Sequence, residues 1–415
     1  MSRITVILAT VLSFMAFTPV AAQDFQKGSD AFDAGDFTTA LQEWTPLAEA
    51  GDADAQYNLG QMYDTGQGVL QDYAEAVRWY RLAADQGYAK AQFKLGYMYA
   101  HGKGVLEDDA EAVRWYRLAA DQGLVEAQFA LGEIYHIGQG VPQDFAEGLK
   151  WYRLAADQGL VEAQFRLGQI YHIGQGVPQY FAEAVRWYRL AADQGFANAQ
   201  HNLGVMYDNG QGVPQDYAKA VKWYRLAAEE GVANAQHNLG LIYQFGKGVL
   251  QDYAEAVRWY RLAADQGHAS AQKHLGDMYH IGQGVLQDDA EAVNWYRLAA
   301  EQGYAPAQFN LGLQYYKSLG VPQDYAEAAR WMLLAANQGG GDAQFVLGLM
   351  HELGHGVIQD KVMAHMWHNI AAANSYDLGG DQRDSIAEGM TQQAIEQAQA
   401  MARECLGSGY TKCGY

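Results

Sequence analysis

The chain has 415 residues, 49% of them apolar, and its 28 basic and 48 acidic side chains give a formal net charge of −20. Such an acidic surface would repel phosphates, which require basic stripes on a protein, so nucleic acid is excluded as a partner. Beyond the first residues, no stretch approaches the length of an apolar membrane span.

Residues 1–22 have the pattern of a signal peptide. Arg3 precedes an uncharged stretch over residues 4–17, and residues 20–22 provide the small side chains that signal peptidase needs for cleavage after Ala22. An uncleaved anchor is the alternative, but residues 4–17 are fewer than the roughly 20 that a spanning helix requires. We therefore expect an exported protein, periplasmic or secreted, with a net charge of −21 once Arg3 is removed.

Residues 23–50 are predicted to form a degenerate first unit of a repeat. The segment from Asp36 to Leu41, together with Trp44, has the apolar spacing of a helix, and Gly35 marks the turn before it. The Gly-x-Gly turn found in eight of the nine later units is missing here. This unit is therefore expected to open the stack in a shortened form.

Residues 51–374 repeat with a fixed period. Tryptophans follow one another at intervals of 36 residues, and the gap between them contains helix-sized apolar patterns on either side of a Gly-rich break. A period of this length is typical of a helical solenoid, in which each unit buries its apolar faces against its neighbours. The sequence predicts that this ladder is core: Trp79, Trp115, Trp151, Trp187, Trp223, Trp259, Trp295, Trp331 and Trp367.

One unit, residues 91–120, shows what each part does. Residues 91–99 place Ala, Leu and Tyr at i, i+4 and i+8, the stripe of a first helix, and residues 109–120 form a second amphipathic helix. Gly96 lies inside the first helix at a cost of ~1 kcal/mol relative to Ala, so we expect two helices to cross closely there. Residues 102–104, Gly-x-Gly, supply the left-handed turn that ends the first helix.

These motifs resemble the Sel1-like repeat, a relative of the tetratricopeptide repeat with a longer loop between its helices. The resemblance rests on Ala-x-x-x-Leu-Gly-x-x-Tyr, Gly-x-Gly-Val and Asp-x-x-x-Ala-x-x-Trp-Tyr, and it covers nine units. It implies an all-α fold, a right-handed superhelical α-solenoid of helix-turn-helix repeats with a 36-residue period. The degenerate first unit is closer to the plain tetratricopeptide form.

Residues 375–415 are predicted to form a helical cap. They contain no Trp and no Gly-x-Gly, as expected of a terminal unit that closes the last apolar face. The chain's two cysteines, Cys405 and Cys413, lie eight positions apart across a Gly-rich turn. In an exported protein they are expected to form one disulfide, with free reactive thiols as the alternative.

A catalytic-looking motif occurs in the ninth unit, where residues 351–355 read His-Glu-Leu-Gly-His. A zinc protease needs both histidines on one helical face, but Gly354 is expected to end the helix between them. His365 and His368 replace apolar and aromatic residues of other units. A metal or pH-sensitive site in this histidine-rich unit stays open, with relaxed packing near the cap as the other explanation.

Nine copies of one unit separate positions that packing constrains from positions that vary. On the first helix the variable positions are spaced i, i+4, i+7 and i+11, which places them on one continuous face. We interpret this face as a recognition surface free of packing, with unconstrained solvent surface as the alternative. Its candidate partner-binding residues are Lys90, Lys94, Tyr97, His101, Asn202, Asn238, His274 and Asn310.

The sequence thus predicts a non-enzymatic, exported scaffold or regulator that binds a protein or extended peptide in a groove, without cofactor or metal. The resemblance implies roles known for exported Sel1-like proteins: envelope assembly factors, periplasmic inhibitors of sensor kinases and secreted factors acting on host cells. The alternative is a muropeptide- or penicillin-binding or hydrolysing protein of the cysteine-rich type. Those relatives carry a cysteine pair in nearly every repeat, whereas this chain has the terminal pair.

Overall fold

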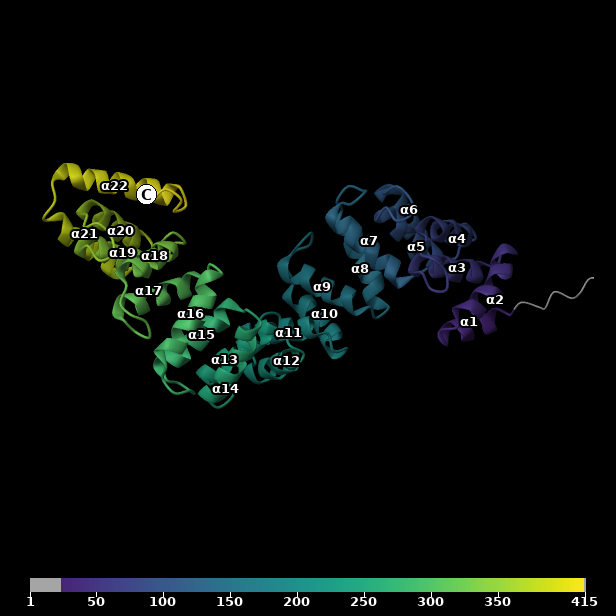
Figure 1. Ribbon diagram of the computed structural model, residues 1–415, viewed down its shortest axis with the longest axis horizontal. Helices are drawn as coiled ribbons and strands as arrows, with labels where there is room; N and C mark the ends of the chain where they lie inside the picture. Colours follow the sequence, from purple (N-terminus) through teal and green to yellow (C-terminus); the bar gives the residue numbers. More distant parts are fainter. Residues whose placement is uncertain (1–23, 414–415) are drawn as a thin grey trace, which may run out of the picture. The chain divides into compact units, whose positions relative to one another are not determined.

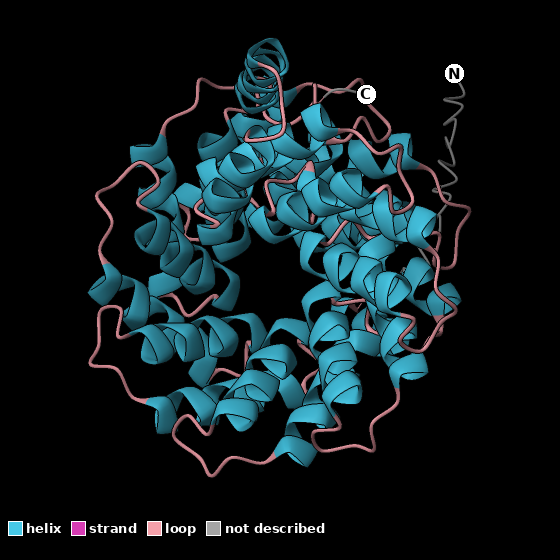
Figure 2. Cartoon of the chain, turned by 90° about the vertical axis from the view of Figure 1, so that its left-hand side faces the viewer, coloured by secondary structure: helices cyan, strands magenta, loops and turns pink. Residues whose placement is uncertain are grey.

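The computed structural model describes residues 24–413, and throughout this range it consists of helices joined by turns (Figure 2). The predicted all-α fold with a 36-residue period is therefore confirmed for the described residues. The predicted signal peptide lies outside them. The chain divides after Tyr180 into two compact units, and each is considered by itself.

The first unit contains nine helices in the described residues, which follow one another along the chain in Figure 1. They are α1 (Phe25–Asp33), α2 (Phe37–Glu49), α3 (Ala53–Thr65), α4 (Tyr73–Asp85), α5 (Ala89–Ala100), α6 (Asp109–Asp121), α7 (Val125–Ile137), α8 (Phe145–Asp157) and α9 (Val161–Ile173).

The second unit continues the same alternation and adds the C-terminal helices. Its helices are α10 (Phe181–Asp193), α11 (Ala197–Asn209), α12 (Tyr217–Glu229), α13 (Ala233–Phe245), α14 (Tyr253–Asp265), α15 (Ala269–Ile281), α16 (Asp289–Glu301), α17 (Ala305–Lys317), α18 (Tyr325–Ala336), α19 (Gly341–Leu353), α20 (Lys361–Ala373), α21 (Asp377–Ala387) and α22 (Gln392–Gly407).

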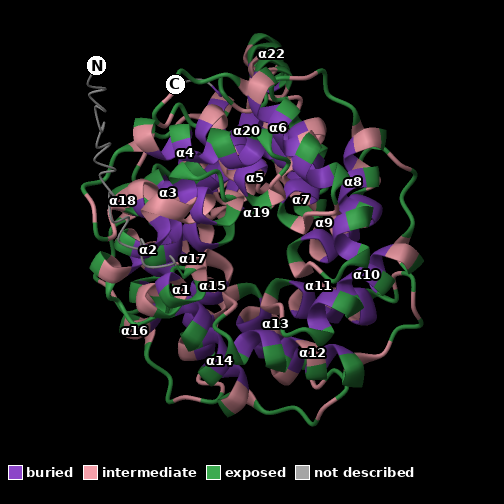
Figure 3. Ribbon diagram, turned by 90° about the vertical axis from the view of Figure 1, so that its right-hand side faces the viewer, coloured by how far each residue is buried: buried purple, intermediate pink, exposed green. Residues whose placement is uncertain are grey.

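Helices pair in the order of the chain. From α3 to α20, an odd-numbered helix is the first helix of a repeat and the next even-numbered one is its second helix; within each unit a second helix also packs against the following first helix. Buried residues line these contacts, whereas the connecting loops are mostly exposed (Figure 3). Within each unit, the successive repeats therefore add layers to one core.

Gly96 explains how closely the two helices of a repeat approach. A Cβ built on Gly96 would lie 2.9 Å from Cδ1 of Tyr116 on the paired second helix, closer than real Cβ atoms come to other heavy atoms. The tyrosine ring thus lies directly against the glycine backbone. The close crossing expected from the sequence is confirmed, and it accounts for a helix-weakening residue inside the first helix.

The turn between the two helices follows the predicted chemistry. Gly102 and Gly104 have positive φ angles of 60° and 69°, which side chains with a Cβ rarely adopt. Asp108 then caps α6 by accepting a 2.9 Å hydrogen bond from the backbone N–H of Glu111. Glu111 also pairs with Arg114 at 2.6 Å on the exposed side of the helix. These contacts set where the second helix starts.

Consecutive repeats are joined by a glutamine bridge that sequence periodicity did not predict. The buried Gln92 donates from Nε2 to the carbonyl oxygen of Ala84 at 3.1 Å, and its Oε1 accepts a 2.7 Å hydrogen bond from Nε2 of Gln122. A second link runs from Arg117 to the hydroxyl of Tyr135 at 2.5 Å. Because these residues are 18 or 30 positions apart, they tie helices of neighbouring layers together.

The tryptophan ladder is core with two exceptions. Most of these indoles are buried, but Trp223 and Trp295 are only half-buried, so the prediction that Trp223 is buried between repeats is wrong. At Trp223 the residue four positions earlier is Lys219, whereas Trp259 donates from Nε1 to the carboxylate of Glu255 at 3.1 Å. This partner does not decide burial, because the half-buried Trp295 also donates to Glu291 at 2.9 Å, and the buried Trp79 and Trp187 have no hydrogen-bond partner for Nε1 among the described residues.

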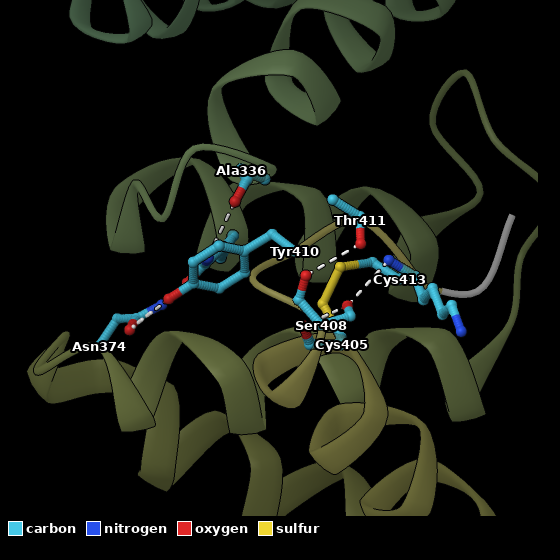
Figure 4. The surroundings of a disulfide bond; sticks show 9 residues. Ala336, Asn374, Cys405, Ser408, Tyr410, Thr411 and Cys413 are labelled. Carbon is cyan, nitrogen blue, oxygen red and sulfur yellow. Dashed lines mark hydrogen bonds between the residues drawn. A yellow bond between two sulfur atoms is a disulfide. The ribbon is translucent and has the colours of Figure 1, made fainter.

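The C-terminal end is closed by α22, which packs against α20. Cys405 and Cys413 form a disulfide, as predicted (Figure 4). The loop between them is held by the hydroxyl of Tyr410, which donates to Oδ1 of Asn374 at 2.9 Å. Nδ2 of Asn374 in turn donates to Oε1 of Gln344 at 2.8 Å, so the disulfide loop terminates the series of interlayer bridges.

Candidate functional site

The variable positions identified in the sequence lie on the first helices. We call the residues at the register of Lys90, Lys94, Tyr97 and His101, in every repeat, the first-helix face. Lys90 in α5 and His101 directly after it are exposed, while Lys94 and Tyr97 in α5 are half-buried. Within the second unit, Figure 3 shows α11 and α13 on one side of the second helices α10, α12 and α14. In the second unit the first-helix face therefore lies on the side formed by the first helices.

In the first unit, residues of this face contact the preceding repeat. Lys94 approaches Oδ2 of Asp64 at 4.0 Å, whereas the ring of Tyr97 lies 4.1 Å, centroid to centroid, from that of His101 within the same repeat. Two repeats further on, Arg166 pairs with Glu133 through hydrogen bonds of 2.9 and 3.1 Å. The face carries charges of both signs, partly satisfied by one another.

In the second unit the face is richer in carboxamides, and His274 lies at its register, while His201 and His237 lie one position before it. Nδ2 of Asn238 lies 3.3 Å from Nε2 of His201, Nε2 of His237 lies 3.3 Å from Nδ1 of His274, and Asn310 donates to Oδ1 of Asp277 at 3.1 Å. Each pair joins neighbouring first helices.

The expectation that these positions are free of packing is therefore wrong for Asn238, His274 and Asn310, because the side chains are half-buried and bridge two repeats. Asn202 is also half-buried, with Oδ1 3.2 Å from Nδ1 of His201. Periodicity within one helix does not reveal such contacts, because they depend on how adjacent repeats stack.

The half-buried imidazoles on and beside this face in the second unit are neutral near pH 7, because their pKa values are lowered. Burial, with His274 and His268 nearby, lowers the pKa of His237 to about 3. Burial also lowers the pKa values of His268 and His274. The three rings lie close together, His237 and His268 stacking at 4.8 Å between centroids. They therefore offer hydrogen-bonding edges and ring surface, and add no positive charge.

The first-helix face also contains a row of large apolar side chains, which was not predicted from the sequence as a contact surface. At the register of His101, in the last turn of each first helix, several repeats carry an isoleucine, leucine or phenylalanine that is more than half exposed. Such exposure of large apolar groups at one repeated position marks a surface suited to association. We call these residues the apolar row: Ile137 (62%) and Ile173 (68%) in the first unit, and Phe245 (60%), Ile281 (59%) and Leu353 (53%) in the second.

Two cavities open beside the first helices of the second unit. One, of about 320 Å³, is lined mainly by apolar residues of α17 to α19, including Phe309 and Ala343. The other, of about 270 Å³, is lined mainly by polar residues of α15 to α17. Lys273 and Asn310 line both. Of these two residues, Asn310 was predicted from the sequence to bind a partner, and Lys273 was not.

The His-Glu-x-x-His motif does not form a metal site in the structure. Helix α19 ends at Leu353, and Gly354 turns the chain with a φ of 72°, as expected. His351 is buried with Nδ1 3.3 Å from the carbonyl oxygen of Ile358, whereas His355 stacks on Tyr325 at 4.4 Å between ring centroids. Across residues 24–413, no group of three or more His, Cys, Asp or Glu side chains is arranged to hold a metal ion.

His365 and His368, on α20, are buried in the C-terminal repeat. His368 takes the place of the tyrosine that faces the first-helix glycine in most other repeats: a Cβ on Gly348 would lie 2.6 Å from its Cε1. Nδ1 of His365 and both ring nitrogens of His368 have no hydrogen-bond partner. Burial, together with the nearby His365, lowers the pKa of His368 to about 4. These rings are structural at neutral pH and sensitive to acid.

Among the helices of residues 24–413, none combines the length and the apolar composition of a membrane span. A family model described as Sel1 repeat matches nine consecutive segments of 36 residues. The matched residues are 53–88, 89–124, 125–160, 161–196, 197–232, 233–268, 269–304, 305–340 and 341–376.

Two solved structures are similar over most of their length. The crystal structure of c5321, a protective antigen present in uropathogenic Escherichia coli strains, is 34% identical, with coverage of 93% of this chain and 92% of that one and a TM-score of 0.64. A Sel1 repeat protein from Oxalobacter formigenes is 35% identical, with coverage of 77% and 93% and a TM-score of 0.61. No curated protein matches the chain.

Proposed function

Because nine Sel1 repeats fill residues 53–376, the chain belongs to the Sel1 repeat family, and we propose that it is an exported scaffold binding a protein or extended peptide along its first-helix face. Repeats that stack in one dimension generally act as protein-interaction modules, because they present one long surface rather than a single deep pocket. Catalysis forms no part of this proposal.

The observation that carries the proposal is the apolar row. Side chains such as Phe245 and Ile281 are about 60% exposed at equivalent positions of adjacent repeats, so they recur along the surface at the spacing of the layers. Burying such groups against a partner releases roughly 25 cal/mol per Å² of apolar area. Loop leucines such as Leu250 and Leu286 also recur at one position and are 91% exposed, so the experiment must set the two surfaces against each other.

Polar residues next to the row complete an interface. Asn238 and His274 are held in place by hydrogen bonds to the preceding repeat, so little side-chain entropy is lost when a partner binds. Their remaining donors and acceptors suit the N–H and C=O groups of an extended backbone. An apolar row flanked by preorganised polar groups is the arrangement that peptide-binding grooves use.

Export is supported by the signal-peptide pattern of residues 1–22 and by the disulfide between Cys405 and Cys413. Disulfides persist in the periplasm and outside the cell, and are rare in the cytosol. N-terminal sequencing of the protein purified from a periplasmic fraction should begin at Gln23. A cytosolic protein that retains Met1 would contradict export.

The binding experiment compares two pairs of matched substitutions. Phe245→Ser with Ile281→Ser removes part of the apolar row, while Leu250→Ser with Leu286→Ser changes loop leucines that are 91% exposed. Affinity capture from cross-linked envelopes should recover a partner with the wild type and the loop variant, and several-fold less with the row variant. Equal recovery with all three proteins would contradict the proposed surface.

A further inference from the structure

Adjacent first helices in the second unit break the repeat pattern at positions that meet in one cavity. Lys273, on α15, stands where all eight other repeats carry a ring. The equivalent residues are Tyr57, Phe93, Phe129, Phe165, His201, His237, Phe309 and Phe345. A half-buried lysine thus replaces an aromatic or imidazole side chain in this repeat alone.

The next repeat breaks the pattern at a buried position. Gln314, on α17, is 3% exposed, and its Oε1 has no hydrogen-bond partner. A buried polar atom without a partner costs stability, so an unmatched one in a repeated core is a sign of a site. The eight equivalent residues are all Met or Ile: Met62, Met98, Ile134, Ile170, Met206, Ile242, Met278 and Met350.

A third departure follows on the same helix. Ser318 ends α17 in the left-handed region with a φ of 58°, where all eight other repeats have glycine. A backbone that holds a non-glycine residue in this conformation is strained, and such strain clusters at binding sites. The next residue, Leu319, lines the 270 Å³ cavity together with Lys273 and Gln314.

The charges of this cavity are not balanced. Asp277 accepts from Lys273 at 2.7 Å, from the hydroxyl of Tyr296 at 2.8 Å and from Asn310 at 3.1 Å, so its carboxylate is fully engaged. Lys317, in the last turn of α17, has no ion-pair partner among the described residues. The cavity therefore contains two lysines and one carboxylate.

This local excess is unusual for the chain. Lys273 and Lys317 are the basic residues of the five first helices α11, α13, α15, α17 and α19, and both line the same cavity in a protein of net charge −20. His280 also lines this cavity, but its Nδ1 already contacts Oδ1 of Asp289 at 2.5 Å, so that nitrogen is not free for a ligand. The carbonyl ends of α15 and α17, each worth about half a negative charge, oppose an anion here, and Lys317 is the cation of this cavity that no acidic side chain of the described residues neutralises.

The neighbouring cavity has a different character. It measures about 320 Å³ and shares Lys273 and Asn310 with the first. Its other lining residues are apolar groups such as Phe309 and Ala335, together with Gly340 and one acidic residue, Asp342. A cationic cavity with an unmatched acceptor thus adjoins an apolar one of side-chain size.

We propose that these two cavities bind the C-terminal residue of a polypeptide, its carboxylate at Lys273 and Lys317 and its apolar side chain beside Phe309. The backbone N–H of that residue donates to the unmatched Oε1 of Gln314, which a carboxylate alone would leave unpaired. Lysine–carboxylate hydrogen bonds are among the stronger kinds, so the free terminus is the main determinant of recognition. This inference rests on the proposed function, of which it specifies the partner's chemistry.

The test uses the full mature chain and fluorescently labelled hexapeptide libraries with randomised residues. Three libraries are compared by fluorescence anisotropy: free C-terminal carboxylates, C-terminal amides, and amides with one internal aspartate. We expect the free-carboxylate library to bind at least about tenfold more tightly than the amides, with apolar last residues enriched among the bound peptides. Failure of the free-carboxylate library to bind, or equal affinity of the amide or internal-aspartate library, would overturn the proposal.

The matched variant restores the repeat pattern. Lys273→Phe with Gln314→Met introduces residues found at these positions in other repeats, so it is expected to fold, and its melting curve checks this. It should lose the preference for free carboxylates, whereas Leu286→Ser should keep it. A variant that keeps the preference would overturn the site. If that variant still captures the partner while the Phe245→Ser and Ile281→Ser protein does not, the proposed function stands and this inference fails.

Discussion

Gln302 donates a 2.7 Å hydrogen bond from Nε2 to Oε1 of Gln272, thirty residues earlier in the chain. The same bridge links Gln266 to Gln236 and Gln338 to Gln308. Each buried glutamine is thereby satisfied on both sides, since its own Nε2 donates to a carbonyl oxygen of the preceding second helix. The bridge joins one layer of the stack to the next.

One bridge is absent, and this yields the first prediction. Oε1 of Gln200 is buried without a partner, and the residue thirty positions later is Glu230, whose carboxylate cannot donate. Glu230→Gln should complete the bridge and raise the free energy of unfolding by about 1 kcal/mol in urea titrations. Gln302→Glu, the matched control, should lower it by a similar amount. No change in either protein would show that the bridges do not stabilise the stack.

The second prediction concerns acid. The folded-state pKa of His368 is about 4, against about 6.5 for a free histidine, so the unfolded chain binds more protons between these values. Stability is therefore complete above about pH 6.5 and falls as the pH drops towards 4, by roughly 3 kcal/mol. His365, whose pKa is also lowered by burial and by Arg383, adds to the loss, while Asp384 opposes it.

The matched variant for this prediction is His368→Tyr, since tyrosine fills the equivalent position in most repeats. Fluorescence of the buried Trp367 should report loosening of the C-terminal repeat near pH 5 in the wild type. The tyrosine variant should hold its signal to lower pH. Identical pH profiles for the two proteins would exclude His368 as the source of the acid sensitivity.

The third prediction separates two tryptophans of the ladder. Trp259 is 4% exposed, whereas Trp223 is half-buried. Trp259→Ala should therefore cost ~3–5 kcal/mol and split thermal unfolding into more than one transition, because each repeat contacts its neighbours alone. Trp223→Ala should cost clearly less. Calorimetry that finds a single transition and equal losses would show that burial does not govern the ladder.

The fourth prediction concerns the disulfide. Replacing Cys405 and Cys413 by serine should destabilise the C-terminal cap by about 2–3 kcal/mol, because the loop loses its cross-link. Hydrogen exchange should then rise first in α22 and around Tyr410, whose hydroxyl binds Asn374. Peptide mapping of the exported wild type should recover the two cysteines linked. Recovery of both as alkylated thiols without prior reduction would contradict the bond.

The fifth prediction tests the His-Glu-x-x-His motif. His351→Ala with His355→Ala should change neither zinc content nor peptidase activity, because the two rings have separate partners, Ile358 and Tyr325, on either side of the helix end. Metal analysis and a casein assay provide the measurements. Loss of bound zinc together with loss of hydrolysis would reverse our interpretation of this motif.

The sequence by itself determined the repeat and its internal packing. Each unit must bury the same faces against its neighbours, so the 36-residue period exposes core positions such as Leu95, Gly96 and Tyr116. The Gly-x-Gly turn was predictable because its glycines act on the local backbone, whatever the neighbouring repeats do. The Cys405–Cys413 bond is also local, spanning one turn.

The tertiary structure alone decided which residues of different repeats meet. Asn238 and His201 are 37 positions apart, and Gln302 and Gln272 are 30 apart, so their contact depends on the crossing of helices in successive layers. Comparing the nine copies could have shown that Lys273 and Gln314 are each exceptional. Their register positions differ, however, and only the stacking of α15 and α17 brings the two side chains into one cavity. How far a side chain is buried depends on the neighbouring repeat as well as on its own helix.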